Sequence, residues 1–130
     1  MAGRTLAEID AAAAPWPTEL RISQDKTTLA ITFDDGAAFE LSAELLRVES
    51  PSAEVQGHGP GQKQLVAGKR AVRIAEAQPN GNYAVRLTFD DGHATGIYSW
   101  RYLRFLGENK DDLMADYADA LAEQGLSREG

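Results

Sequence analysis

Two nearly identical turn sequences carry the side chains best suited to acid/base or metal chemistry. Residues 31–36 are I-T-F-D-D-G and residues 87–92 are L-T-F-D-D-G, so each copy presents two adjacent carboxylates. Only the second copy is followed by a histidine, His93, where the first copy has an alanine. A neutral imidazole beside Asp90 and Asp91 can ligate a divalent metal or share acid/base chemistry with them. The structural alternative is that aspartate before glycine simply accepts backbone hydrogen bonds in a turn.

The other histidine, His58, lies in the glycine-rich stretch G-H-G-P-G. If that loop folded over the second turn, His58, His93 and either Glu49 or Glu54 would form a set of two imidazoles and one carboxylate. Such a set suits non-haem iron. The alternative for His58 is a solvated loop residue, and for His93 a hydrogen-bonded structural residue.

Other catalytic patterns are missing from the sequence. Neither histidine has an evident serine partner, and cysteine is absent. The glycines of residues 57–61 lack the Gly-Lys-Ser/Thr ending of a phosphate-binding loop. A group of aromatic residues at helix-like spacing is typical of a core, with a ligand groove as the alternative: Tyr98, Trp100, Tyr102 and Phe105.

Composition bounds the class of protein. The chain of 130 residues fits one domain, and its net charge of −7 argues against a nucleic-acid partner. Its basic residues Lys63, Lys69, Arg70 and Arg73 are expected to form a solvated strand edge. No apolar run is long enough to span a membrane, and the N-terminus makes a poor signal peptide. We therefore expect a cytoplasmic protein without a membrane partner.

The repeated turn indicates an internal structural repeat. Each copy is followed by a Leu-Arg pair, Leu46-Arg47 and Leu103-Arg104. The repeat predicts strand, turn, strand and short helix, used twice, and its Asp-Gly step favours a two-residue type I′ turn. Alternating apolar residues predict strands over 19–24, 27–33, 37–41, 70–77, 83–89 and 93–97. The pattern predicts an α+β fold with a mostly antiparallel sheet.

Helices are expected after each return strand and at the C-terminus. Ser42 is placed to cap a short helix that runs through Arg47, and residues 98–106 predict its counterpart. Residues 110–124 predict an amphipathic helix, capped by Asn109 and ended by Gly125. Its apolar face is expected to pack on the sheet through Leu113, Met114, Tyr117 and Leu121.

These elements divide the chain into three segments. Residues 1–17 are expected to be a flexible N-terminal segment, in which 5–13 form at most a frayed helix. Residues 18–107 form the domain, and residues 108–130 add the C-terminal helix packed on it. Residues 48–64 predict a long loop between the two repeats, and loops of this length are often functional or disordered.

The quoted motifs resemble the gamma-butyrobetaine hydroxylase-like N-terminal domain family. The resemblance covers roughly residues 19–107, and its most specific part is the string D-G-H-x-T-G-I-Y-x-W-x-x-L-R from Asp91 to Arg104. In the hydroxylases this domain precedes an iron- and 2-oxoglutarate-dependent catalytic domain. Similar domains stand alone in bacteria or are joined to P-loop ATPases of the iron–sulfur carrier type. The resemblance implies the stand-alone form, and it does not imply hydroxylase activity.

The resemblance also raises the question of a structural zinc site. The family holds zinc through a Cys-x-Cys-x-x-Cys loop and the histidine of Asp-Gly-His. The cysteine positions correspond to Ser50, Ser52 and Val55 here, and only His93 matches. Serine is a poor ligand for structural zinc and valine is none. We expect no zinc of the family type, and a loop held by packing and hydrogen bonds or else mobile.

The leading hypothesis is a non-enzymatic binding or adaptor module. Its expected binding surface joins the second turn to the following helix: Asp90, Asp91, His93, Tyr98, Trp100 and Arg104. The resemblance implies a protein partner in iron or iron–sulfur metabolism. The alternative is a metal-binding protein, weakly binding iron, or a small-ligand-binding protein centred on His93. A third hypothesis, an enzyme that uses Asp90, Asp91 and His93, requires a pocket.

Overall fold

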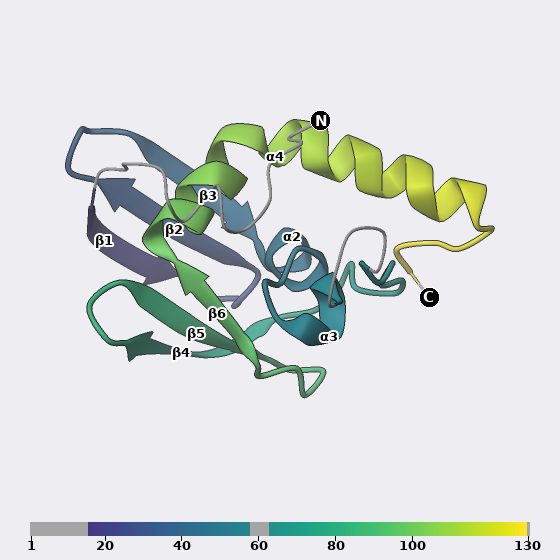
Figure 1. Cartoon of the computed structure of the whole chain (residues 1–130), viewed down its shortest axis with the longest axis horizontal. Coiled ribbons are helices and arrows are strands. Elements are labelled where there is room, and N and C mark those ends of the chain that lie inside the picture. Colours follow the sequence, from purple (N-terminus) through teal and green to yellow (C-terminus); the bar gives the residue numbers. More distant parts are fainter. Residues whose placement is uncertain (1–15, 58–62, 130) are drawn as a thin grey trace.

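Two antiparallel sheets of three strands each form the framework of the protein (Figure 1). The computed structural model describes residues 16–57 and 63–129. The first sheet has the order β1 (Pro17–Ile22), β2 (Thr28–Phe33) and β3 (Ala38–Ser42). The second has the order β4 (Ile74–Asn80), β5 (Ala84–Phe89) and β6 (Gly96–Ser99). The helices within these described residues are α2 (Ala43–Val48), α3 (Ala53–Gln56) and α4 (Trp100–Glu123). The α+β class is confirmed, with two sheets in place of one.

The internal repeat is confirmed, and it is longer than the sequence indicated. Each unit has three strands, because β1 and β4 pair with β2 and β5 in the same way. Both pairings shift register at the same step, between Pro17 and Glu19 in one sheet and between Ile74 and Glu76 in the other. A shared irregularity of this kind marks the two sheets as copies of one design.

The two Asp-Asp-Gly turns have the same geometry, but they are not the expected type I′ turns. Phe33 N donates to Ala37 O at 2.8 Å, and Phe89 N donates to His93 O at 2.9 Å, so three residues separate each bonded pair. Among the described residues positive φ is confined to glycines and Lys26, whereas a type I′ turn needs positive φ at both central residues. Gly36 and Gly92 have φ of 89° and 92°. Glycine therefore serves as the third loop residue, in a conformation that a side chain would strain.

Each return strand leads directly into a helix with a serine cap. The hydroxyl of Ser42 accepts from Leu45 N at 3.0 Å, and that of Ser99 accepts from Tyr102 N at 3.1 Å. These bonds satisfy amide groups that the first helical turn leaves without partners. The expected cap at Ser42 is thus confirmed, and Ser99 is its equivalent in the second repeat.

The helices expected at 98–106 and 110–124 are one continuous helix, α4, of 24 residues. Asn109 does not cap a new helix, because its side chain donates to Phe105 O at 2.9 Å. Gly107 lies inside this continuous helix, against the ring of Phe39. The helix ends as expected at Gly125, which has φ of 70°. Leu126 N donates to Leu121 O and Gly125 N donates to Ala122 O, which is a Schellman ending.

Two strands begin later than expected. The strand predicted at 70–77 is β4, which extends to Asn80 and includes Pro79. Because β4 is an edge strand, proline costs it no essential ladder bond. The strand predicted at 93–97 is β6, which begins at Gly96. The second repeat has one more residue than the first between its turn glycine and its capping serine, and β6 is one residue shorter than β3, so residues 93–95 lie outside the ladder.

The inner faces of both repeats contribute to one hydrophobic core. The equivalent strands β2 and β5 alternate buried and less buried residues, as half-buried strands do. The largest fully buried side chains come from both sheets and from the helices: Phe33, Leu29, Ile31, Leu41, Leu45, Leu46, Ile74, Leu87, Phe89, Tyr98, Leu103 and Leu106. Each sheet therefore buries its apolar face through contact with the other repeat.

The C-terminal half of α4 extends beyond the sheets (Figure 1). The expectation that its apolar face packs on the sheet holds only for Leu113, which joins the main core with Met114 against it. Tyr117 and Leu121 instead pack with Val48 of α2 and with the neighbouring residues 66 and 67. The connection between the repeats thus supplies the cover for this end of the helix.

Several expectations fall on residues that the structure does not describe. The flexible segment 1–17 lies outside the described residues up to residue 15, while Pro17 begins β1. His58 also lies outside them, so its placement beside His93 stays a prediction. The loop 48–64 contains α3 in its described part. Within residues 16–57 and 63–129, no helix is both long and apolar enough to cross a membrane.

Candidate functional site

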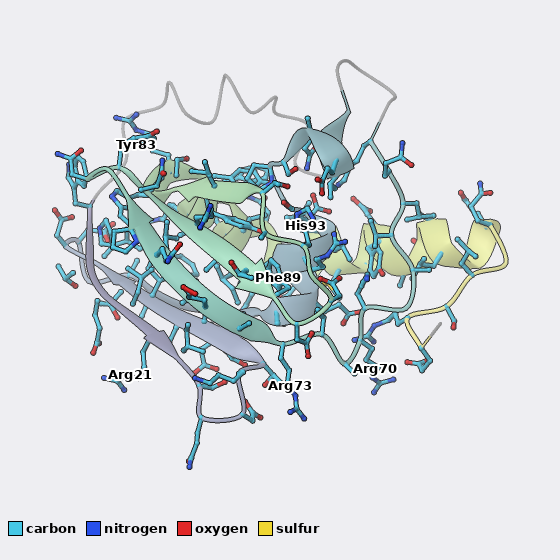
Figure 2. The ribbon with its side chains drawn as sticks, turned by 90° about the horizontal axis from the view of Figure 1, so that it is seen from below. Arg21, Arg70, Arg73, Tyr83, Phe89 and His93 are labelled. Carbon is cyan, nitrogen blue, oxygen red and sulfur yellow. The ribbon has the colours of Figure 1, made fainter. Side chains whose placement is uncertain are left out.

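His93 lies at the end of the second sheet, close to Phe89 (Figure 2). Its side chain is only 3% exposed, and both ring nitrogens have polar partners. Nε2 lies 2.9 Å from Ser50 Oγ, and Nδ1 lies 3.1 Å from Glu54 Oε2. A carboxylate can only accept, so in the neutral ring Nδ1 carries the proton and Nε2 accepts from the serine hydroxyl.

The loop after the first repeat is tied to His93 by hydrogen bonds. Ser50 is fully buried and also accepts from Ser52 N at 3.3 Å. Ser52 Oγ caps α3 by accepting from Glu54 N at 3.1 Å, and it lies 2.7 Å from Thr95 Oγ1. We call these residues the His93 cluster: Ser50, Ser52, Glu54, His93 and Thr95. Packing also holds this loop in place, because Val55 is buried and only 2% exposed.

Gly96 allows Ser50 to approach the second sheet. A Cβ atom at position 96 would lie 2.6 Å from Ser50 Oγ, closer than real Cβ atoms approach, and 3.0 Å from Tyr98 Cε1, which is a tight contact. The backbone of β6 therefore lies against the serine with no room for a side chain. Gly96, where β6 begins, is thus the position that makes room for the loop.

Asp91 anchors the turn beside the cluster. Its carboxylate accepts from Arg47 Nε at 2.8 Å, from Lys69 Nζ at 2.6 Å and from His93 N at 3.0 Å. Burial raises the pKa of Asp91, but the bonds from Lys69, the His93 amide and Arg47 outweigh it and lower this pKa to about 2. The carboxylate is therefore ionised throughout the neutral range and serves as a structural anchor.

His93 is held in its neutral form near neutral pH. Burial lowers the pKa of His93, and the positive charge of Arg47 lowers it further. Glu54 and Asp91 raise this pKa, but they do not outweigh burial. Both nitrogens of this neutral imidazole are bonded within the cluster, and its link to Glu54 connects the interior to the surface, since the Glu54 side chain is 63% exposed.

The six residues predicted as one surface do not form one. Asp91 and His93 are joined by a hydrogen bond, and Asp90 lies exposed beside them with Oδ1 accepting from Arg73 N. The other three are turned away from this surface, although the ring of Tyr98 lies beneath the cluster beside Ser50. Tyr98 is fully buried and donates to Leu46 O, Trp100 is half-buried and donates to Asn82 O, and Arg104 donates to Asp35 in the first turn.

Arg47 is a site residue that the sequence alone did not identify. The signal was present, because Arg47 and Arg104 occupy the same repeat position. Its Nη1 atom is buried and has no hydrogen-bond partner in the described part of the chain. The basic residues expected at a strand edge are also mostly paired: Lys63 with Glu49, Lys69 with Asp91 and Arg70 with Glu129.

The residues around His93 do not fit a structural zinc ion. Ser50 and Ser52 contribute hydroxyls that already have partners within the cluster, and Val55 has no donor atom. Structural zinc is held by four strong donors, usually thiolate or imidazole. In the described residues, no three histidine or acidic side chains converge as a metal-binding group. Hydrogen bonds therefore join the loop to His93, where the resemblance would have placed a metal.

The fold and this turn define a family. The model of the family described as gamma-butyrobetaine hydroxylase-like, N-terminal, matches residues 20–104. The chain therefore belongs to the gamma-butyrobetaine hydroxylase-like N-terminal family. The match concerns the N-terminal domain of such hydroxylases and includes no catalytic domain. No curated protein matches the sequence.

Solved structures support the same assignment. Two proteins solved by NMR in solution are 42% and 47% identical to this chain, each with a TM-score of 0.78. The alignments cover 90% and 91% of this chain, and 92% and 88% of theirs. A crystal structure from Acidithiobacillus ferrooxidans, of unknown function and from the DUF971 family, is 39% identical with a TM-score of 0.61. That alignment covers 73% of this chain and 98% of the other.

Proposed function

We propose that this protein is a non-enzymatic binding module whose partner-binding region is the His93 cluster together with Asp90. The observation that carries this proposal is the difference between the two repeats. They share strands, register shift, turn and capped helix. Only the second has a histidine after the turn, and there a loop with α3 packs on the sheet.

The comparison of repeats separates structural from functional roles. The first turn closes through Ala37 O just as the second closes through His93 O, so the fold does not require an imidazole at this position. His93 nevertheless occupies a buried place with two polar partners, which is costly to desolvate. A residue that the fold can replace with alanine, and that connects to an exposed carboxylate, is a candidate for recognition.

Charge indicates the kind of partner. The exposed charged groups of this region are the carboxylates of Glu54 and Asp90, with the exposed Arg73 beside Asp90, and the whole chain carries a net charge of −7. Such a face favours a protein with a complementary basic surface. The family resemblance supports a partner in iron or iron–sulfur metabolism, and this part of the proposal rests on the resemblance alone.

A quantitative affinity capture tests the proposal. Wild-type protein, the variant E54Q/D90N and the control D34N are immobilised and exposed to native lysate, and captured proteins are quantified by mass spectrometry. Asp34 is the counterpart of Asp90 in the first turn and is also exposed. We expect one or more proteins that wild type and D34N retain and that E54Q/D90N loses by on the order of tenfold.

The same captures can contradict the proposal. If the retained proteins are identical for all three baits, the His93 region is not the binding region. Circular dichroism and thermal unfolding of each bait serve as the folding control, because exposed acids contribute little to stability.

The second candidate function is a metal or small-ligand site at His93. Its support is that Nδ1 of His93 and Glu54 are one imidazole and one carboxylate at 3.1 Å, with His58 in the same loop by sequence. A heteronuclear NMR titration with Zn(II), and with Fe(II) under anaerobic conditions, tests it. Saturable changes centred on His93 that H93A abolishes would favour this function over the adaptor. No specific response in the wild type would reject it.

A further inference from the structure

The two repeats are joined by reciprocal arginine–aspartate bonds. We define repeat 1 as residues 17–48 and repeat 2 as residues 74–104. Arg47 of repeat 1 donates to Asp91 in the turn of repeat 2 at 2.8 Å. Arg104 of repeat 2 donates to Asp35 in the turn of repeat 1 at 3.0 and 3.2 Å. Each arginine comes directly after the leucine of its repeat and reaches the second aspartate of the other repeat. This is the pattern of a twofold, isologous interface.

The backbone hydrogen bonds and the core residues of the two repeats are related by the same twofold symmetry. Ala43 N donates to Thr27 O in repeat 1, and Trp100 N donates to Tyr83 O in repeat 2. Equivalent inner-face residues of β2 and β5 meet in one core, so each repeat has an apolar face that the other repeat covers. The interface is therefore apolar at its centre and charged at two symmetric points.

The His93 cluster lies across this interface. Ser50, Ser52 and Glu54 come after repeat 1, whereas His93 and Thr95 belong to repeat 2. Tyr102 of repeat 2 likewise donates to Glu49 O at 2.5 Å. The bonds that fix the position of His93 and Thr95 in the cluster thus join the two halves of the chain.

We propose that this interface also forms between two copies of the chain, so that the two copies exchange repeats. Repeat 1 of one copy then binds repeat 2 of the other through the same core and the same two arginine–aspartate bonds. The exchanged dimer contains two His93 clusters, each with Ser50 and Glu54 from one copy and His93 from the other. This exchange goes beyond the binding role and does not depend on it.

The connection between the repeats sets the concentration at which exchange occurs. Residues 49–73 link the repeats, so the contact within one chain competes with exchange between two chains. Exchange requires the interface to open, because its contacts are already made within one chain. We therefore expect the dimer when chains refold together at about millimolar concentration, and we expect it to persist on dilution.

Complementary charge reversals provide a direct test. The variant R104D places two carboxylates together within one chain, and D35R places two cations together. In the exchanged heterodimer of these variants, the new carboxylate at position 104 meets the new cation at position 35, and the other pair is native. The two variants are unfolded, mixed, refolded together and weighed by native mass spectrometry, with twice the 14.1 kDa chain mass expected for the dimer.

The expected result is a 1:1 heterodimer, with on the order of tenfold more dimer in the mixture than in either variant refolded alone. Wild type mixed with R104D is the matched control, because exchange relieves no repulsion there. The cis double variant D35R/R104D restores the pair within one chain and is expected to be a folded monomer at low concentration. Only monomers in the mixture, together with a folded cis variant, would overturn the proposal. So would wild type that stays monomeric after refolding at about millimolar concentration.

Discussion

At the level of single residues, His93 is a buried polar group whose surroundings are fitted to its neutral form. Ser50 donates to one ring nitrogen and Glu54 accepts from the other, while Arg47 adds a positive charge nearby. Protonation would place a cation in a buried site next to a guanidinium. The imidazole is thus a fixed hydrogen-bonding group at neutral pH and a source of instability in acid.

This environment predicts a pH-dependent stability. Burial lowers the pKa of His93 below its ordinary value of 6.5, so at acidic pH the unfolded chain binds more protons than the folded chain. The stabilising contribution is complete above pH 6.5 and is lost as pH falls below it. Between about pH 7 and about pH 5, wild type should lose more free energy of unfolding than H93Q. Urea unfolding at each pH measures these free energies, and an equal loss in wild type and H93Q would contradict the prediction.

The Asp91 carboxylate acts in a separate pH window, which keeps the two groups distinguishable. Its pKa is lowered from 3.8 to about 2, so its contribution is lost only as pH falls through that range. A D91N variant should therefore keep the loss seen between about pH 7 and about pH 5.

The contact between Gly96 and Ser50 predicts the effect of one added methyl group. In G96A the new Cβ would overlap Ser50 Oγ and crowd the ring of Tyr98. We expect a loss of about 1–3 kcal/mol in the free energy of unfolding. Because S50G removes the closest contact, the double variant S50G/G96A should lose less than the sum of the single variants. A G96A protein as stable as wild type, measured by urea unfolding, would show that the loop yields easily.

At the level of elements, α4 serves both repeats. Its first turn repeats the capped helix α2, and its later turns cover β3 where Gly107 lies against Phe39. The helix α2 has no such extension, because the chain leaves it at Glu49 and forms the loop of the His93 cluster instead. The two repeats thus differ in the segment after the Leu-Arg pair, and that difference creates the candidate site.

Gly107 allows two opposing effects on α4 to be compared. Replacing glycine by alanine inside an exposed helix stabilises by about 1 kcal/mol. Here the new Cβ would lie 2.5 Å from Phe39 Cγ, and overpacking of this kind costs about 1–3 kcal/mol. We expect G107A to be destabilising in the wild type and stabilising in an F39A background. Thermal and urea unfolding of the four proteins measure the change of sign, and the same sign in both backgrounds would refute the steric argument.

At the level of the whole molecule, the two arginine–aspartate bonds hold the repeats together with unequal strength. The Arg47 and Asp91 side chains are 12% and 19% exposed, whereas Asp35 is 41% exposed. Burial reduces screening by water and salt, so the inner pair should contribute more. Nη1 of Arg47, which has no hydrogen-bond partner among the described residues, offsets part of that gain.

A pair of double-mutant cycles tests this ranking. The cycle of R47Q and D91N should give a coupling energy of about 1–2 kcal/mol that changes little with salt. The cycle of R104Q and D35N should give a smaller coupling that decreases as salt is added. Urea unfolding at low and high ionic strength measures both cycles. A larger coupling for the outer pair would reverse the ranking.

The local features of this protein follow from its sequence alone. The repeated turn, the alternation of apolar residues and the capping serine at Ser42 each act over a few neighbouring residues, so their patterns can be read along the chain. The end of α4 at Gly125 belongs to the same group, because a positive φ there favours glycine. The family resemblance also pointed to Ser50, which does meet His93.

Tertiary structure was needed to show which distant groups meet. Arg47 and Asp91 are 44 positions apart and Arg104 and Asp35 are 69 apart, so no local pattern relates them. Packing also decided that Tyr98 is buried and that the strands divide into two sheets. Propensity acts within one element, whereas these outcomes depend on the shape and charge that the other repeat presents. The candidate site lies where the two repeats meet, so the fold had to be known before it could be defined.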